Sequence, residues 1–222
     1  MLFNVWAPKA LSVSVVGEFN KYDGRVHLME RIEDTGVFEL FIPGLAAGCG
    51  YMYEIKRQGK GTTRKLDPVS RQISSVPITA SVVSDENMPD SYAWNDGLWM
   101  IKRKKEAGKK KPVTVYEVSL TDWLKEKSAD ELVDFVKQEG YTHVCFLPVA
   151  EYLNEEMNGY STLGYFAVTH RTGGSDAFKK LVDDCHNAGI GVIIDWNGAY
   201  FGTEVKGLYD FDGADAYGYL KP

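Results

Sequence analysis

The sequence predicts an antiparallel, immunoglobulin-like β-sandwich followed by a parallel α/β domain. Up to about residue 99, short alternating apolar runs are separated by turn residues, which is typical of antiparallel sheets. After Pro112, strand-like apolar runs alternate with helical stripes. A strongly basic run lies between the two patterns. We therefore predict a sandwich over residues 1–101, a linker over 102–111 and a second domain over 112–222.

The composition is that of an ordinary globular protein. The 222 residues leave room for one large or two small domains, and 44% of them are hydrophobic. A net charge of −6 argues against nucleic acid as the main partner. No apolar run is long enough to cross a bilayer, and none resembles a signal peptide. With three widely spaced cysteines, we expect a reduced, cytoplasmic protein without a membrane partner.

Five strands are predicted in the first part of the chain. Each is a short apolar or alternating run, and several stop at a glycine or proline turn, as the strand that ends at Gly17 does. The predicted strands span residues 3–6, 11–16, 37–42, 51–55 and 78–83.

The basic run Lys102–Lys111 has two interpretations. Its charge is suited to binding an anion or a nucleic acid. However, the run is short and contains no aromatic residue on which a base could stack. We therefore interpret it as a solvated linker between the two domains.

The second part alternates strands and helices. A capping box of Ser128 and Glu131 begins one predicted helix, and Ser175 with Asp176 begins the next. Glycines at positions 140 and 189 end these helices. The predicted strands around them span residues 113–120, 143–147 and 192–195. This order corresponds to two right-handed βαβ crossovers and a parallel sheet.

Asp195 is the first candidate binding residue. It follows the uninterrupted apolar run of GIGVIIDW (residues 189–196), which is typical of a buried parallel strand. In parallel α/β folds, ligands are met where the strands end. The sequence therefore places the Asp195 carboxylate where a ligand would bind.

Several motifs of the second part resemble one family. VYEVSLTDW (115–123), GYTHVCFLPVAEY (140–152), NGYSTLGYFAVTHR (158–171) and CHNAGIGVIIDW (185–196) resemble the glycogen (1,4-α-glucan) branching enzymes of glycoside hydrolase family 13. Those enzymes have a (β/α)₈ catalytic barrel. The resemblance implies glycogen metabolism, an α-glucan ligand and a partial (β/α)₈ barrel comprising about the first three strands.

The first part resembles the carbohydrate-binding module of family 48 that precedes this barrel. The motifs that carry the resemblance are FNVWAPKALSVSVVGEFNKYDGR (3–25), GVFELFIPGL (36–45), YMYEI (51–55) and LDP (66–68). Tyr22 replaces a tryptophan typical of the family. Tyrosine can stack on a sugar less extensively than tryptophan. Two readings stay open: the module binds sugar through Tyr22, or it only packs against the barrel.

In the second part, the resemblance implies two further substrate-binding residues. Tyr160 corresponds to the residue that stacks under the sugar, and Asp195 to an acceptor of a sugar hydroxyl. The neighbouring positions depart from the family. Asn158 and Ser161 flank the Gly159-Tyr160 pair where a tryptophan and a glutamine are usual, and Tyr200 replaces a sugar-binding histidine.

We predict no catalytic residue. A (β/α)₈ barrel takes roughly 250 residues, and residues 112–222 reach only its third strand. The family's catalytic carboxylates lie on later strands. A recruited pair of Glu151 and Asp195 is not favoured, although retaining transfer needs two carboxylates about 5 Å apart. Asp210-Phe211-Asp212 resembles a metal-binding D-x-D motif, but this tripeptide is common by chance, so we predict no metal and no cofactor.

Two functions from different classes remain open. The chain is either a catalytically incomplete pseudoenzyme that binds α-glucan or docks on another enzyme, or a subunit or fragment of an active branching enzyme. A third possibility is a chain without selected activity. Three parallel strands leave a sheet edge and an apolar face uncovered. We therefore expect a homo-oligomer or another chain that completes the barrel.

Overall fold

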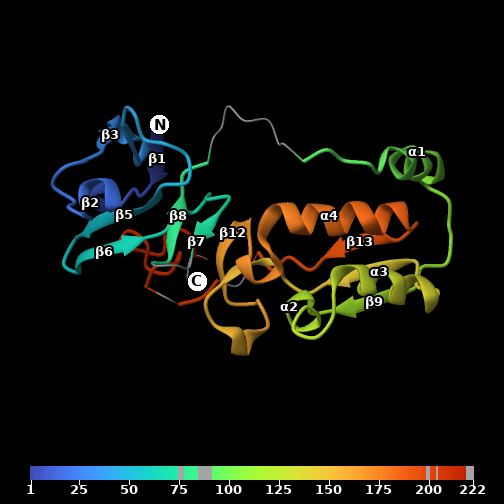
Figure 1. Ribbon diagram of the computed structural model, residues 1–222. Coiled ribbons are helices and arrows are strands. Elements are labelled where there is room, and N and C mark those ends of the chain that lie inside the picture. The colour runs from blue at the N-terminus through green and yellow to red at the C-terminus, as the bar shows by residue number, and fades with distance from the viewer. Residues whose placement is uncertain (75–77, 85–91, 199–200, 204, 219–222) are drawn as a thin grey trace. The chain divides into compact units, whose positions relative to one another are not determined.

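The computed structural model describes residues 1–74, 78–84, 92–198, 201–203 and 205–218. The chain forms two compact units. The first consists of Met1–Asn87, Ala150–Ala167 and Gly198–Pro222, and the second of Met88–Val149 and Val168–Asn197. Figure 1 shows the elements of each unit.

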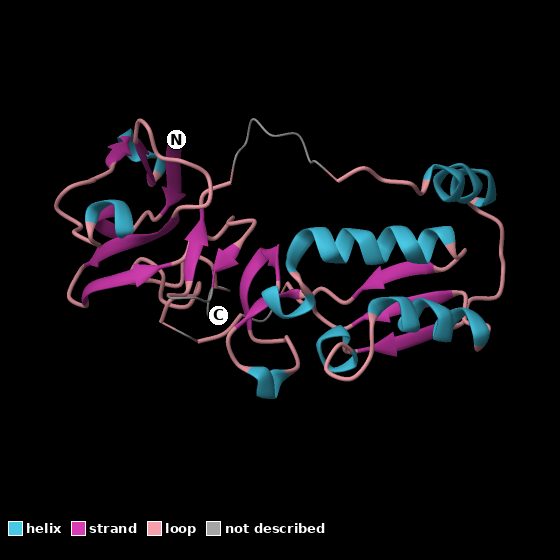
Figure 2. Ribbon diagram, viewed as in Figure 1, coloured by secondary structure: helices cyan, strands magenta, loops and turns pink. Residues whose placement is uncertain are grey.

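The described residues of the N-terminal part of the first unit, before residue 88, form two antiparallel sheets, drawn as magenta arrows in Figure 2. One sheet has the order β1 (Leu2–Trp6), β4 (Val37–Phe41) and β3 (Glu30–Ile32). The other has the order β2 (Ala10–Gly17), β5 (Gly50–Arg57), β8 (Ala80–Val82) and β7 (Ile73–Ser74), with β6 (Gly61–Lys65) also paired to β5. Two short 3₁₀ turns, η1 (Glu18–Asn20) and η2 (Glu33–Thr35), lie between strands. Antiparallel sheets in the N-terminal part are confirmed and are consistent with a β-sandwich.

The core of the first unit is formed by alternate residues of strands from both sheets. Val13 and Val15 of β2 and Tyr53 and Ile55 of β5 are fully buried in one apolar cluster. The same cluster contains Phe3, Val5 and Phe38 from the other sheet. Because side chains alternate along a strand, these inward positions are two residues apart.

The other face of β2 and β5 is covered by residues from later in the chain. Val16 and Met52 form a second apolar cluster with Leu163 and Ala167. The last two belong to β12 (Thr162–Val168), which pairs with β11 (Ala150–Tyr152). The sheet is thus buried on both faces, and residues 150–167 are part of its packing.

The segment after Gly198 also contributes to the first unit. Phe211 is fully buried in the core of the sandwich, and its ring lies 5.0 Å from that of Tyr217. The Tyr217 hydroxyl donates a hydrogen bond to the Trp6 carbonyl oxygen at 2.9 Å. The backbone N–H of Leu66 donates to the Lys206 carbonyl oxygen, also at 2.9 Å. We call residues 205–217 the C-terminal strap.

The second unit is built on a parallel sheet of three strands in the order β9 (Val115–Val118), β10 (His143–Phe146) and β13 (Gly191–Ile194). Its helices are α1 (Gly97–Glu106), α2 (Leu120–Trp123), α3 (Ala129–Gln138) and α4 (Gly174–Asn187). The 3₁₀ turn η4 (His170–Thr172) also belongs to the second unit, whereas η3 (Glu155–Met157) belongs to the first. Helices α3 and α4 lie beside the sheet in Figure 2 and share its apolar core, which contains Val144, Phe146, Leu132 and Leu181. The predicted parallel α/β arrangement is confirmed for these strands.

The capping prediction holds for one helix and not for the other. Ser128 caps α3: its hydroxyl accepts from the Glu131 N–H, and the Glu131 carboxylate accepts from the Ser128 N–H. Helix α4 begins one residue before Ser175, and its N-cap is Gly173, with φ +87° and no side-chain cap. The prediction that Ser175 begins α4 as its cap is therefore wrong. Gly173 and Gly174 both have positive φ, so the chain turns into the helix through glycine instead.

The predicted linker also differs from the structure. Helix α1 covers residues 97–106, and only residues 107–111 of the basic run are turn and coil. Lysine and arginine are good helix formers, and in the last turn they interact favourably with the helix dipole. The compact units also differ from the single break that the sequence predicts, because residues 150–167 and the strap belong to the first unit.

Candidate functional site

Tyr22 lies on a loop that is closely fixed by Asn20. The Asn20 side chain accepts from the Gly17 N–H at 3.0 Å and donates to the Val15 carbonyl oxygen at 2.9 Å. Gly17 is needed at the loop entrance because a Cβ there would lie 2.4 Å from the Gly50 carbonyl oxygen. Tyr22 itself has φ +58°. A non-glycine residue in this region is uncommon and is often found at functional sites.

The half-buried ring of Tyr22 is held against the sheet by Arg64. The Arg64 guanidinium carbon lies 5.6 Å from the ring centre, and its Nη2 donates to the Tyr22 carbonyl oxygen at 3.0 Å. Arg64 also forms an ion pair with Glu54 at 3.0 Å. These contacts fix the position of the Tyr22 ring, with the Arg64 guanidinium beside it and the Glu54 carboxylate paired to that guanidinium.

Tyr22 also lines a pocket of about 150 Å³ in the first unit. The other lining residues are Glu18, Gly48, Gly50, Ser74, Ile78, Ala80 and Val82. The pocket therefore combines an aromatic ring, a carboxylate, a hydroxyl and side-chain-free backbone. A hydroxylated ring ligand suits such a lining, because its C–H face can stack while its hydroxyls bond to the polar groups.

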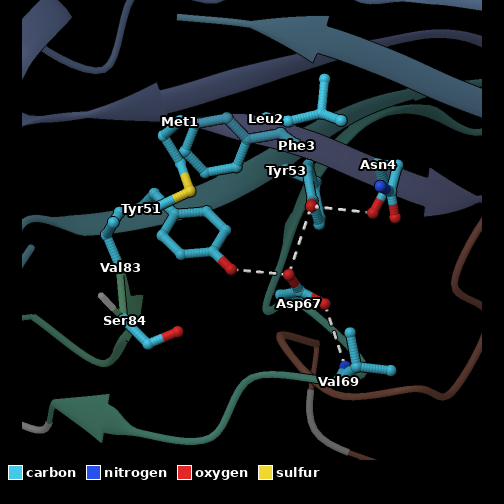
Figure 3. Close-up of a pocket in the computed structure, with 10 residues that line it drawn as sticks. All are labelled: Met1, Leu2, Phe3, Asn4, Tyr51, Tyr53, Asp67, Val69, Val83 and Ser84. Carbon is cyan, nitrogen blue, oxygen red and sulfur yellow. Dashed lines mark hydrogen bonds between the residues drawn. The ribbon is translucent and has the colours of Figure 1, made fainter. Parts of the chain in front are cut away.

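A second pocket of the first unit, of about 100 Å³, is shown in Figure 3. Its polar centre is Asp67, which is buried and lies two residues after the end of β6. Tyr51 and Tyr53 point their hydroxyls at the same oxygen, Oδ2, and donate to it at 2.6 and 3.2 Å. The other oxygen, Oδ1, accepts from the Val69 N–H at 2.9 Å. We call this the Asp67 pocket.

Burial determines the proton affinities in the Asp67 pocket. Desolvation raises the pKa of Asp67, although the hydrogen bonds from Tyr51, Val69 and Tyr53 oppose this shift. Desolvation and the nearby carboxylate also raise the pKa of Tyr53 well above its ordinary value. The Tyr53 hydroxyl lies 3.2 Å from both Asp67 Oδ2 and the Asn4 carbonyl oxygen, so the two acceptors share its single proton in a bifurcated hydrogen bond.

The two predicted residues of the second part lie in different compact units. Tyr160 is half-buried in the first unit, and its N–H donates to the Met157 carbonyl oxygen at 2.8 Å. Asp195 is half-buried in the second unit, where it directly follows β13. Its N–H donates to the Phe146 carbonyl oxygen at 2.9 Å, which continues the parallel pairing. Asp195 thus lies at a strand end, and Tyr200 falls outside the described residues.

The remaining carboxylates of the sequence analysis make structural contacts. Glu151 is buried in β11 and accepts from the Tyr152 N–H. Asp210 pairs with Arg57 and Lys60, each at 2.8 Å. Asp212 is fully buried and accepts from the backbone N–H of Lys9 at 2.8 Å. The two carboxylates of the D-x-D tripeptide therefore attach the C-terminal strap to the sandwich.

The part of the chain that the structure describes holds neither a cluster of metal-binding side chains nor a helix that could span a membrane. No group of three or more histidine, cysteine, aspartate or glutamate side chains there could hold a metal ion. None of the helices described is long and apolar enough to cross a membrane. The three cysteines are free thiols, and Cys185 is buried.

The Asp67 pocket is a feature that the sequence analysis missed. Tyr51 and Tyr53 stand in the motif YMYEI, and Asp67 stands in LDP. Both motifs carry the resemblance to the carbohydrate-binding module, and neither was considered as a binding site. A signal was present: Tyr51 and Tyr53 are two residues apart in a predicted strand and so point to the same face. Buried phenols usually find a hydrogen-bond partner, and a nearby aspartate is a natural acceptor.

Comparison with known proteins shows what the chain is similar to. Residues 1–70 match the family model of carbohydrate-binding module 48 (isoamylase N-terminal domain). The 1,4-alpha-glucan branching enzymes GlgB of Nitrosococcus oceani and Methylococcus capsulatus are 41% and 43% identical to the chain over 232 aligned positions. Both alignments cover the whole chain but only 31% of the relative. The chain thus spans about a third of the length of these relatives.

A solved structure shows a similar fold. The crystal structure of a putative alpha amylase from Salmonella typhimurium superposes with a TM-score of 0.69 and 25% sequence identity. The match covers 92% of this chain and 32% of that protein.

Proposed function

We propose, from the homology of this chain with the N-terminal part of 1,4-alpha-glucan branching enzymes, that it binds α-glucan. The observation that carries the proposal is the Tyr22 pocket, which lies in a sandwich that matches carbohydrate-binding module 48. The half-buried ring of Tyr22 offers the aromatic surface, and Glu18 and Ser74 offer the hydroxyl partners. The alternative that the module only packs against other parts of the protein predicts no contribution from Tyr22.

We also propose that the second part is the beginning of a (β/α)₈ barrel of glycoside hydrolase family 13. Strands β9, β10 and β13 pair in chain order, with α3 and α4 between them, as consecutive barrel units do. The likeness to the putative alpha amylase supports this proposal. Asp195, directly after β13, would then contribute a sugar contact from the barrel part, and Tyr160 would contribute another from residues 150–167.

The isolated chain would bind glucan without transferring it. Glycosyl transfer with retention needs a nucleophilic carboxylate and an acid/base carboxyl across the sugar. Asp210 and Asp212 hold the strap, and Glu151 is buried in β11. Incubating the purified chain with amylose should therefore leave the iodine-stain spectrum unchanged. A spectral shift with chain free of other polypeptides would show that it carries a complete transfer site.

The second candidate function is that of a part of an active branching enzyme, and the parallel sheet favours it. On the face opposite α3 and α4, Val115 and Ile193 remain 43% and 40% exposed. Cys145 lies between Ile193 and Glu117 in the strand register. An apolar parallel sheet is normally covered on both faces. We propose that further barrel strands, supplied by another chain or by more of the same one, cover this face.

The partner proposal is tested by the molar mass in solution. Light scattering of the chain alone should show self-association through the uncovered face, and Ile193→Glu should reduce it, because a charge cannot be buried there without a partner. A monomer of 24.8 kDa that melts cooperatively would contradict the need for a partner. We further propose a cytoplasmic location, which the three free thiols support.

Glucan binding is tested by native electrophoresis in gels that contain glycogen. The chain should migrate more slowly than in gels without glycogen, and Tyr22→Ala should restore much of the lost mobility, because the stacking surface is removed. Tyr209→Ala is the matched control, since its side chain is 49% exposed on the C-terminal strap. Equal mobility of the wild-type chain with and without glycogen would refute the proposal.

A further inference from the structure

The Asp67 carboxylate has one hydrogen-bonding position left over. An ionised carboxylate offers about four acceptor positions. Asp67 uses three of them: two on Oδ2 for the phenols and one on Oδ1 for the Val69 N–H. Since Asp67 is only 8% exposed, solvent cannot freely complete its shell. The spare position belongs to Oδ1, which lies on the Val69 side of Asp67 in Figure 3, and both Asp67 and Val69 line the Asp67 pocket.

A second polar group borders the same space. Ser84 is exposed, and its hydroxyl makes no hydrogen bond to any residue that the structure describes. In Figure 3 this hydroxyl is turned toward the side of the pocket where Asp67 and Val69 lie. A ligand hydroxyl between them could donate to Asp67 and accept from Ser84. One O–H group of a sugar performs both roles at once.

Aromatic and aliphatic side chains form the remaining wall. The rings of Phe3 and Tyr51 lie 4.9 Å apart in an edge-to-face arrangement, and Met1 and Val83 flank them. The exposed side chain of Val69 also lines the pocket. At about 100 Å³ the pocket has room for several water molecules, and so for part of one pyranose ring. It has no room for a longer oligosaccharide.

We propose that the Asp67 pocket is a second sugar site, which takes a single glucosyl unit such as the end of an α-glucan chain. The ligand class rests on the proposed function, whereas the site itself rests on the pocket and on the spare acceptor position of the Asp67 carboxylate. The Tyr22 pocket is lined by a different set of residues, so the two contacts are separable. A module with two sugar contacts holds a branched polymer more firmly than one contact does, because the second binding event is intramolecular.

The test follows backbone amides of the full ¹⁵N-labelled chain during a titration with maltose. The Val69 N–H is the reporter, because it donates directly to Asp67 Oδ1 and responds when a ligand reaches that oxygen. We expect a saturable shift of the Val69 and Ser84 amides in the wild-type chain and equally in Tyr22→Ala. Ser84→Leu, which adds bulk at a residue that lines the pocket, should weaken binding at least fivefold, and Ser84→Ala about threefold.

The control is Ser175→Leu, which makes the same exchange at an exposed serine of the other compact unit and should leave the Val69 titration unchanged. If Ser84→Leu does not fold, Ser84→Ala decides, because it removes only the hydroxyl. A Val69 amide that maltose does not shift would overturn the inference, even when glycogen still retards the chain. In that case the proposed function stands and only the second site is lost.

Discussion

Phe211 tests whether the sandwich depends on the C-terminal strap. Phe211 is fully buried in the same cluster as Val13 and Tyr53, although it follows them by more than 150 positions. Phe→Ala in a core typically costs 3–5 kcal/mol, from lost transfer energy and the remaining cavity. The strap has no regular strand and can partly collapse into the space, so we expect the lower end, about 3 kcal/mol.

The assay is native-state hydrogen exchange of the β2 and β5 amides, combined with urea unfolding. A loss of about 3 kcal/mol increases the open population of these amides roughly a hundredfold. Phe41→Ala is the matched control, because the Phe41 side chain is 64% exposed on the same sandwich and should change stability by less than about 0.5 kcal/mol. A cost for Phe211→Ala below about 1 kcal/mol would show that the strap is not part of the sandwich core.

Two further predictions concern a helix cap and a buried lysine. Ser128→Ala should lower the free energy of unfolding by about 1 kcal/mol, because the Glu131 N–H loses its acceptor; Ser175→Ala should have no measurable effect in the same urea titration. Burial lowers the pKa of Lys65 to about 8, from 10.5. Between these values the unfolded chain binds the proton and the folded chain does not, so stability should rise by about 3 kcal/mol from pH 8 to 10.5. Lys65→Met should flatten this rise and Lys60→Met, at a half-exposed position, should not; a slope that survives Lys65→Met would refute the assignment.

The separation of the chain into antiparallel and parallel parts could be read from local patterns. Alternation with a period of two marks strands such as β2 and β5, and the helical stripe after the capping box at Ser128 marks α3. These signals are local because each depends on residues within one element. For the same reason the strand end at Asp195 could be located without a structure.

The packing of distant segments could not be predicted in this way. Nothing local to β12 indicates that Leu163 and Ala167 cover the outer face of a sheet formed by much earlier residues. The two aspartates of the D-x-D tripeptide are similar: their partners Arg57 and Lys9 lie more than 150 positions earlier. Such contacts are decided by shape and charge complementarity between elements, which a window of neighbouring residues does not contain.

The sequence by itself located the main strands of the first part and helices α3 and α4, and its motifs indicated the resemblance to carbohydrate-binding module 48, with Tyr22 in one of them. Only the tertiary structure decided that residues 150–167 and the strap complete the first unit, and that Tyr51, Tyr53 and Ser84 surround Asp67. The physical reason is that secondary structure follows the period of side chains along one segment. A pocket forms only where several segments bring their side chains to the same point.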